Sequence, residues 1–289
     1  MDGILLINKE QGFTSQDVVS NVKKILNLKK AGHAGTLDPM ATGLVVVLLE
    51  EATKLSPYLL NEEKVYEAEV TLGIATDTED KTGTIVSSKT VDRLDLGYLD
   101  RILKGLIGKQ EQIPPMFSAI KSSGKKLYEL ARQGISISRE ARQIEILDLK
   151  RTSEVCYEDG IAKFSFITRV TKGTYIRTLC AEIGFRLNYP AHMSALKRLA
   201  SGKFTLEQSF SFEELVAGKV EIISPLQAMV DRKIVRLDEK EYKKVKNGMT
   251  LANKEKFAEC DLVVLEYQNR LVAIYKKDEK GYKAERVWN

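Results

Sequence analysis

Apolar and polar positions along the chain follow the two-residue period of β-strands in several places. Residues 3–9 predict a short strand, and the continuous apolar run at residues 44–49 is typical of a strand buried on both faces. Residues 64–72 and 161–170 alternate between apolar and polar instead, which predicts half-buried strands. Within the first of these, the alternation turns Tyr66 inward.

Other segments follow the helical period. Val18, Val22 and Leu26 form an apolar stripe, and Thr14 or Ser15 is placed to cap the helix that carries them. Further helices are expected at residues 51–60 and 94–107. Past residue 231 the pattern changes to short strands separated by turns, at 261–267 and 270–275. We therefore expect an α+β protein with a large domain at residues 1–230 and a small β-rich domain at 231–289.

Composition places the chain among ordinary globular proteins. It has 289 residues, of which 43% are hydrophobic and 29% charged, enough to bury a large core. The apolar runs are too short for a membrane span, and the first residues lack the basic region and cleavage site of a signal peptide. Three widely separated cysteines fit a reducing compartment, and two histidines make a His/Cys metal cluster improbable. We expect a cytoplasmic protein with no membrane partner and no metal.

Positive charge is concentrated in the middle of the chain. The net charge is −4 for residues 1–118, +8 for 119–203 and +1 for 204–289. Concentrated positive charge is typical of a protein that binds a polyanion such as nucleic acid. An extended segment with two prolines leads here into a basic stretch that contains Tyr128 and the cations Lys125, Lys126, Arg132, Arg139 and Arg142. Such a stretch suits an arm that grips phosphates, and an exposed linker helix is the alternative.

A glycine-rich segment, residues 32–43, precedes the buried strand and carries one carboxylate, Asp38. Glycines permit unusual backbone conformations, and a loop on a rigid strand is a common place for a reactive group. The alternative is structural, with Asp38 as a helix N-cap and Pro39 at the first helical position.

Arg177 and Tyr66 are further candidates. A Lys-Gly-Thr turn at residues 172–174 leads into a helix whose first turn carries Arg177. A cation there opposes the helix dipole, so Arg177 either pairs with a carboxylate or phosphate or is a solvated surface residue. Tyr66 is a candidate for ring stacking, or else a core tyrosine whose hydroxyl is hydrogen-bonded.

Six collinear motifs resemble the TruB family of tRNA pseudouridine-55 synthases, over nearly the whole chain. They lie at residues 32–43, 64–68, 76–80, 114–121, 173–177 and 196–204. The resemblance implies an α+β catalytic domain on a long, mainly antiparallel sheet. It also implies a C-terminal domain similar to the PUA RNA-binding fold, and an insertion at about residues 118–151 that grips the T stem-loop of tRNA.

The resemblance also implies roles for individual residues. Asp38 corresponds to the catalytic carboxylate, Arg177 to its partner and Tyr66 to the ring that stacks on the target base. The pocket for the extruded nucleotide corresponds to His33, Tyr175 and Leu199, with Asp80 and Lys9 as secondary contacts. One residue departs from the family pattern, because Glu10 follows Lys9 where the family usually has proline.

The reaction that the resemblance implies, isomerisation of uridine to pseudouridine, involves no net redox change and requires no cofactor. It requires a carboxylate beside the sugar, an aromatic ring to hold the base, and extrusion of the nucleotide from the RNA. We expect tRNA as partner and a monomeric enzyme. Three alternatives stay open: a glycoside hydrolase using Asp38 and Asp80, a phosphate-binding glycine loop, and a non-catalytic RNA-binding protein.

Overall fold

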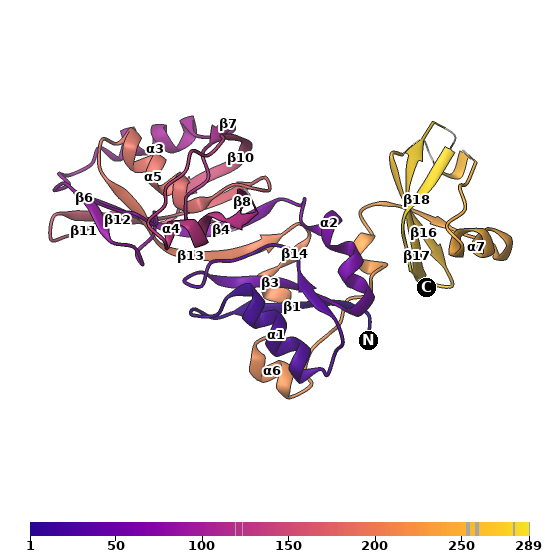
Figure 1. The fold of residues 1–289 in the computed structure, drawn as a ribbon. Helices are drawn as coiled ribbons and strands as arrows, with labels where there is room; N and C mark the ends of the chain where they lie inside the picture. Colours follow the sequence, from indigo (N-terminus) through magenta and orange to yellow (C-terminus); the bar gives the residue numbers. More distant parts are fainter. Residues whose placement is uncertain (119, 123, 253–254, 258–259, 280, 289) are drawn as a thin grey trace.

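A long, mainly antiparallel sheet is the centre of the computed structural model, which describes residues 1–118, 120–122, 124–252, 255–257, 260–279 and 281–288 (Figure 1). Its main path runs in the order β1 (Gly3–Lys9), β3 (Thr42–Leu49), β13 (Ala191–Ser201), β4 (Lys64–Leu72), β12 (Ile161–Val170), β10 (Arg142–Arg151) and β7 (Gly108–Gln112). Every pair along this path is antiparallel except β3 with β13. The predicted fold class is therefore confirmed.

One face of this sheet carries the larger apolar core. Side chains of α1 (Ser15–Ile25), α3 (Leu96–Gly105), α5 (Ile176–Arg186) and α6 (Phe212–Val216) pack there against the inward residues of β4, which include Tyr66. In Figure 1, α3 and α5 lie over one end of the sheet, and α1 and α6 lie near the other. Thr14 caps α1 through a reciprocal pair of hydrogen bonds with Asp17, as the sequence pattern predicts.

Short elements complete the part of the chain up to residue 229. They are β2 (Ala31–His33), η1 (Glu50–Leu55), α2 (Ser56–Leu59), β5 (Ile74–Thr76), β6 (Ile85–Ser88), β11 (Cys156–Glu158), β14 (Phe204–Thr205), η2 (Leu206–Gln208) and η3 (Gln227–Met229). Of these, β2, β11 and β14 extend the main sheet, and β5 pairs with β6 as a separate hairpin.

A second sheet is built from the end of the chain. It contains β15 (Lys233–Arg236), β16 (Leu262–Tyr267), β17 (Arg270–Asp278) and β18 (Gly281–Val287), accompanied by α7 (Glu239–Lys246) and η4 (Glu255–Phe257). It lies to one side of the long sheet in Figure 1. Side chains from both sheets, among them Leu6 and Val264, meet in one apolar cluster. The sequence analysis names segments for β16 and β17 but none for β15 or β18. Strand β15 is only four residues long and pairs in parallel with β16.

The basic segment leaves the long sheet between β7 and β10. We call residues 113–141 the arm. It contains β8 (Lys121–Ser122), β9 (Lys125–Lys126) and α4 (Leu127–Ala131). The insertion that the family resemblance implies, about residues 118–151, runs past the end of the arm into the long sheet. Residues 142–151 form β10, a strand of the long sheet with Ile144, Ile146 and Leu149 buried.

None of the helices in the described ranges is both long and apolar enough to cross a membrane.

Candidate active site

Asp38 lies in the loop between β2 and β3, at the first position of a tight turn. The N–H of Ala41 donates to the carbonyl of Asp38 at 3.0 Å, and the chain enters β3 at Thr42. No helix follows Asp38 in this fully described segment, so the interpretation of Asp38 as a helix cap is wrong.

Residues on either side of Asp38 are tied to the N-terminal part of the chain. The N–H of Leu37 donates to the hydroxyl of Ser15 at 2.7 Å, and Ser15 is buried in the first turn of α1. The N–H of Gly12 donates to the carbonyl of Pro39 at 2.8 Å. Asp38 therefore projects from a loop whose backbone is held on both sides.

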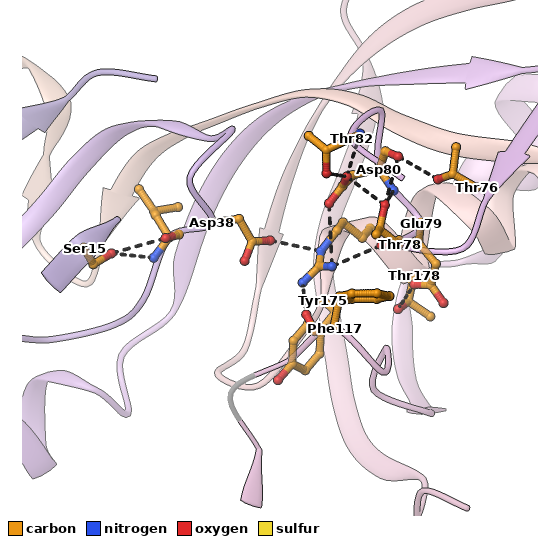
Figure 2. Close-up of polar contacts among 12 residues, drawn as sticks. Ser15, Asp38, Thr76, Thr78, Glu79, Asp80, Thr82, Phe117, Tyr175 and Thr178 are labelled. Atoms are coloured by element: carbon orange, nitrogen blue, oxygen red, sulfur yellow. Dashed lines mark hydrogen bonds and ion pairs between the residues drawn. The ribbon is translucent and has the colours of Figure 1, made fainter. Parts of the chain in front are cut away.

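Arg177 is the partner of Asp38. Its Nε lies 3.0 Å from Oδ2 of Asp38, so the predicted ion pair is present. The other guanidinium nitrogens donate to the carbonyl of Phe117 at 2.8 Å and that of Thr78 at 3.1 Å (Figure 2). Arg177 stands in the first turn of α5, where the helix dipole disfavours a cation, and these acceptors and the carboxylate compensate for that position.

Asp80 is a second carboxylate at the same arginine. Its Oδ2 lies 3.6 Å from Nη1 of Arg177, and its Oδ1 accepts hydrogen bonds from Thr78 and Thr82, at 2.9 Å from Thr78 Oγ1 and 2.9 Å from the Thr82 N–H. The Asp80 side chain is only 7% exposed. The Asp80 carboxylate is therefore engaged with partners inside the protein and is not free to approach a substrate. This geometry argues against a glycoside hydrolase that would use Asp80 as its acid.

The environment of Asp38 pushes its pKa in two directions. Burial raises the pKa above that of an ordinary aspartate, the nearby Arg177 charge lowers it, and the Asp80 charge raises it again, with a net upward shift. The side chain still keeps 35% of its surface exposed, so a molecule in solution can reach it.

The other predicted pocket residues come from four different elements. Tyr66 is buried in β4, and Tyr175 immediately precedes α5, where burial raises the pKa of its phenol. His33 ends β2 with Nδ1 buried and unpartnered among the described residues, and burial lowers its pKa. Leu199 occupies a β-bulge of β13, the extra residue between Arg198 and Ala200.

Lys9, predicted as a secondary substrate contact, has no exposed surface in the structure. Its ammonium donates to three backbone carbonyls, of Glu10 at 2.9 Å, Phe13 at 2.8 Å and Pro39 at 3.3 Å. Burial lowers its pKa to about 8. In this arrangement Lys9 supports the turn before α1 and the loop of Asp38.

The predicted RNA-contacting cations of the arm and its end are exposed where they are described. Lys125, Arg132 and Arg142 are exposed, and the guanidinium of Arg132 lies 5.4 Å from the ring centre of Tyr128. The side chain of Lys126 lies outside the described residues. The carbonyl of Pro114 accepts from Arg139 at 3.0 Å, which ties the returning end of the arm to its beginning.

Sequence reasoning missed several residues that support the site. Ser15 was considered only as a possible cap, Thr78 appeared only within a family motif, and Thr82 was not considered. Arg198 lies within the motif at residues 196–204 but was not singled out, yet it is buried beside the loop of Asp38. As for metal ligands, the described ranges contain no group of three or more His, Cys, Asp or Glu side chains that could hold an ion.

The class that this fold and site define is the pseudouridine synthases. The chain is similar over 99% of its length to a chain in the crystal structure of a Cbf5-Nop10-Gar1 complex, at 26% identity and a TM-score of 0.73, with 84% of that chain covered. It is also similar to a chain in an H/ACA RNP bound to a substrate RNA, at 25% identity and a TM-score of 0.70, covering 99% and 85% of the two chains.

The chain belongs to the TruB family. Residues 23–176 match the model of the TruB family pseudouridylate synthase N-terminal domain, and residues 177–231 match the tRNA pseudouridylate synthase B C-terminal domain. The tRNA pseudouridine synthase B of Bacillus subtilis strain 168 is 44% identical, over 90% of this chain and 86% of the relative. That of Streptococcus agalactiae serotype III is 38% identical, over 99% and 98%. The protein is thus an enzyme, an isomerase that forms pseudouridine.

Proposed function

We propose that the enzyme converts uridine to pseudouridine at position 55, in the T stem-loop of tRNA, with Asp38 as its catalytic carboxylate and without a cofactor. The substrate class is supported by the curated relatives, which are named tRNA pseudouridine synthase B. The position within tRNA is supported by the resemblance of the six motifs and by the exposed cations of the arm.

One observation carries the assignment of Asp38. It is a reachable carboxylate, 35% exposed, that is paired with an arginine only 5% exposed. A buried guanidinium favours the ionised form of a neighbouring carboxylate and keeps doing so when bound RNA displaces water. Asp80 contacts the same arginine but is itself buried, so Asp38 is the carboxylate available to the ribose or the base.

The reaction exchanges one bond for another within the same nucleotide. The bond from N1 of uracil to C1′ breaks, the base turns, and a bond forms between C5 and C1′. The hydrogen of C5 leaves as a proton and N1 gains one, so atoms and charge balance without a redox step. Asp38 serves as nucleophile or as base on the ribose.

The nucleotide must leave the RNA helix for this reaction. Tyr66 is proposed to stack on the uracil, with His33, Tyr175 and Leu199 lining the pocket. The cations Lys125, Lys126, Arg132 and Arg142 are proposed to hold the RNA backbone, and the C-terminal domain from residue 231 to add contacts. The proposal also keeps the expectation of a monomeric enzyme, and a tRNA substrate supports action in the cytoplasm.

The test uses tRNA transcripts labelled with tritium at C5 of uridine, in two versions that differ by a U55→C change. We expect the enzyme to release about one equivalent of tritium from the U55 transcript and none beyond background from the C55 transcript. Asp38→Asn should lower the release rate by about 10³-fold or more while tRNA still binds.

Each other outcome contradicts part of the proposal. Equal release from both transcripts would place the reaction at another uridine. Undiminished release by Asp38→Asn would remove Asp38 from the chemistry. Free uracil in place of tritium release would indicate hydrolysis, and tRNA binding with neither would indicate a non-catalytic RNA-binding protein.

A further inference from the structure

Four successive strands of the long sheet bring one residue each into a single row. Lys9 of β1 pairs with Gly43 of β3, Gly43 pairs with Arg198 of β13, and Arg198 pairs with Tyr66 of β4. Directly paired residues project to the same face of a sheet. Arg198 therefore lies between Lys9, which supports the loop of Asp38, and Tyr66, the proposed stacking ring.

The side chain of Arg198 is buried and satisfied by backbone carbonyls. The residue is 1% exposed. Its Nε donates to the carbonyl of Leu44 at 2.7 Å, one terminal nitrogen donates to Gly35 at 3.2 Å, and the other approaches Thr36 at 3.5 Å. Within the described ranges, no carboxylate oxygen lies within 4.0 Å of the guanidinium. A buried charge is costly unless it is hydrogen-bonded, so these three carbonyls are what makes its burial tolerable.

The three carbonyls belong to the two ends of one loop. Gly35 and Thr36 precede Asp38, and Leu44 follows it at the start of the buried strand. The guanidinium therefore bridges the entry and the exit of the segment that carries the catalytic carboxylate. Ser15 and Lys9 hold the middle of the same segment, at Leu37 and Pro39.

Two glycines of the loop lie against residue 198. Gly35 has φ +114°, and a Cβ added there would lie 3.3 Å from a guanidinium nitrogen of Arg198, a tight contact. Gly43 has φ +99°, and a Cβ there would lie 2.4 Å from the carbonyl oxygen of residue 198, part of the β13 backbone. Both conformations favour glycine. Gly35 thus leaves room for the guanidinium and Gly43 for the backbone of β13, which argues against their use as a phosphate cradle.

Arg198 is also the last regularly paired residue before the bulge of β13. The register shifts between Arg198 and Ala200, so Leu199 has no partner on β4. Bulges next to active sites redirect a side chain. Fixing Arg198 therefore fixes both the loop of Asp38 and the start of the bulge that presents Leu199.

We infer that Arg198 is a positioning residue for this reaction, closing residues 35–44 into a rigid loop so that Asp38 meets the target nucleotide in one geometry. The inference rests on the proposed role of Asp38. Arg198 itself contacts neither Asp38 nor solvent. Its planar guanidinium spans acceptors on two strand ends, which the ammonium of a lysine cannot do with the same geometry.

The test compares Arg198→Lys and Arg198→Met with Lys64→Met. Lys64 is a matched control because it is a buried cation of the neighbouring strand whose ammonium donates to the carbonyls of Leu60 and Glu62, outside the loop. Single-turnover pseudouridine formation at saturating enzyme, tRNA affinity and thermal unfolding are measured for each variant.

We expect Arg198→Met to lower the single-turnover rate constant by about 10²-fold and Arg198→Lys by about 10-fold, because small displacements of a catalytic group have effects of this size. The tRNA dissociation constant should stay within about threefold of the parent. Lys64→Met should lower thermal stability by a comparable amount while its rate constant stays within about threefold. The acid limb of the rate against pH should also move to lower pH in Arg198→Lys, because a displaced Asp38 is better solvated.

Several outcomes would overturn the inference. Equal rate losses in Arg198→Lys and Lys64→Met would show a general effect on folding, and weakened tRNA binding with an unchanged rate constant would show a role in binding. If Arg198→Met does not fold, a normal rate in the folded Arg198→Lys is decisive against it. Asp38→Asn is run in parallel: full activity there would contradict the proposed function, whereas an inactive Asp38→Asn with an active Arg198→Lys contradicts only the positioning role.

Discussion

The Nε of Arg177 lies 3.0 Å from Oδ2 of Asp38, yet the arginine side chain is 5% exposed and the aspartate 35%. The cation is fixed from behind by the carbonyls of Thr78 and Phe117 and by Asp80. The carboxylate is consequently the member of the pair that is open to solvent. This asymmetry makes separate predictions for the two residues possible.

Replacing Arg177 by Met should lower kcat by about 10²-fold or more, since the carboxylate loses the cation that keeps it ionised beside bound RNA. It should also raise the pKa of Asp38 further, because the loss of Arg177 removes the largest downward influence and leaves only the Lys9 charge to oppose burial and Asp80, which both act upward. Arg186→Met is the matched control: Arg186 lies on the same helix in an exposed ion pair with Glu182. An Arg177→Met enzyme as active as Arg186→Met would show that the pair is dispensable.

The parent enzyme should have an acid limb above the ordinary pKa of aspartate, 3.8. Since the pKa of Asp38 is raised, the proton stays on the carboxylate to higher pH, so the active ionised fraction falls earlier as the solution is acidified. The measurement is kcat/KM for tRNA between about pH 4 and pH 7, which reports groups of the free enzyme. An acid limb at or below the ordinary value would contradict the upward shift.

Tyr66 tests whether the ring or the hydroxyl acts on the uracil. Tyr66→Phe keeps the stacking surface and should reduce kcat by less than about tenfold, whereas Tyr66→Ala should reduce it by about 10²-fold or more. Tyr66 is also part of the main core, so thermal unfolding must accompany the kinetics to separate lost packing from lost stacking. A severe effect of Tyr66→Phe would instead assign the chemistry to the hydroxyl.

Sequence pattern predicted the elements with strong periodicity and little of what connects them. The alternation in β4 and β12, the cap of α1 and the buried run of β3 are local signals, and each element is present. The bound of the insertion at about residue 151 came from the family resemblance, and the structure places residues 142–151 in β10, with Ile144 and Ile146 buried. A family motif says where an insertion lies along the chain, and not which of its residues join the sheet.

The candidate site also contains residues whose role the sequence predicted and residues whose role it did not. The pairing of Arg177 with Asp38 followed from a cation at a helix start and from the family resemblance. Ser15 and Arg198 were not predicted as supports because each acts on the backbone of a distant segment, Leu37 and residues 35–44. Contacts from a side chain to a distant backbone leave no periodic trace in the sequence.

The proposed role of the arm predicts how tRNA affinity depends on salt concentration. Changing Lys125, Lys126 and Arg132 to Gln should lower the dependence of log affinity on log salt by about 2 to 3, because each phosphate contact contributes about 0.7 to 0.9. The single-turnover rate at saturating tRNA should change little, since none of the three residues is proposed to contact the reacting nucleotide. Lys104 and Lys150 are exposed outside the arm and serve as controls. An unchanged slope in the triple variant would remove the arm from the RNA interface.

The buried Lys9 predicts how the free energy of unfolding changes with pH. Its pKa in the folded protein is about 8, below the ordinary 10.5, because burial disfavours the charged ammonium. Between these two values the unfolded chain holds a proton that the folded chain has released, so this group makes the free energy of unfolding rise as pH rises. The contribution has a maximal slope of about 1.4 kcal/mol per pH unit.

Lys9→Met removes the titrating group, so the free energy of unfolding of the variant should rise less than that of the parent between pH 8 and pH 10.5, with parallel curves below pH 7. Denaturant unfolding at a series of pH values measures it. Lys64→Met should behave alike, because burial lowers the pKa of Lys64 to about 8 as well. The two variants should differ in catalysis: only Lys9 donates to the carbonyl of Pro39 beside Asp38, so only Lys9→Met should slow pseudouridine formation. Parallel stability curves at all pH values would show that Lys9 keeps an ordinary pKa in the folded protein.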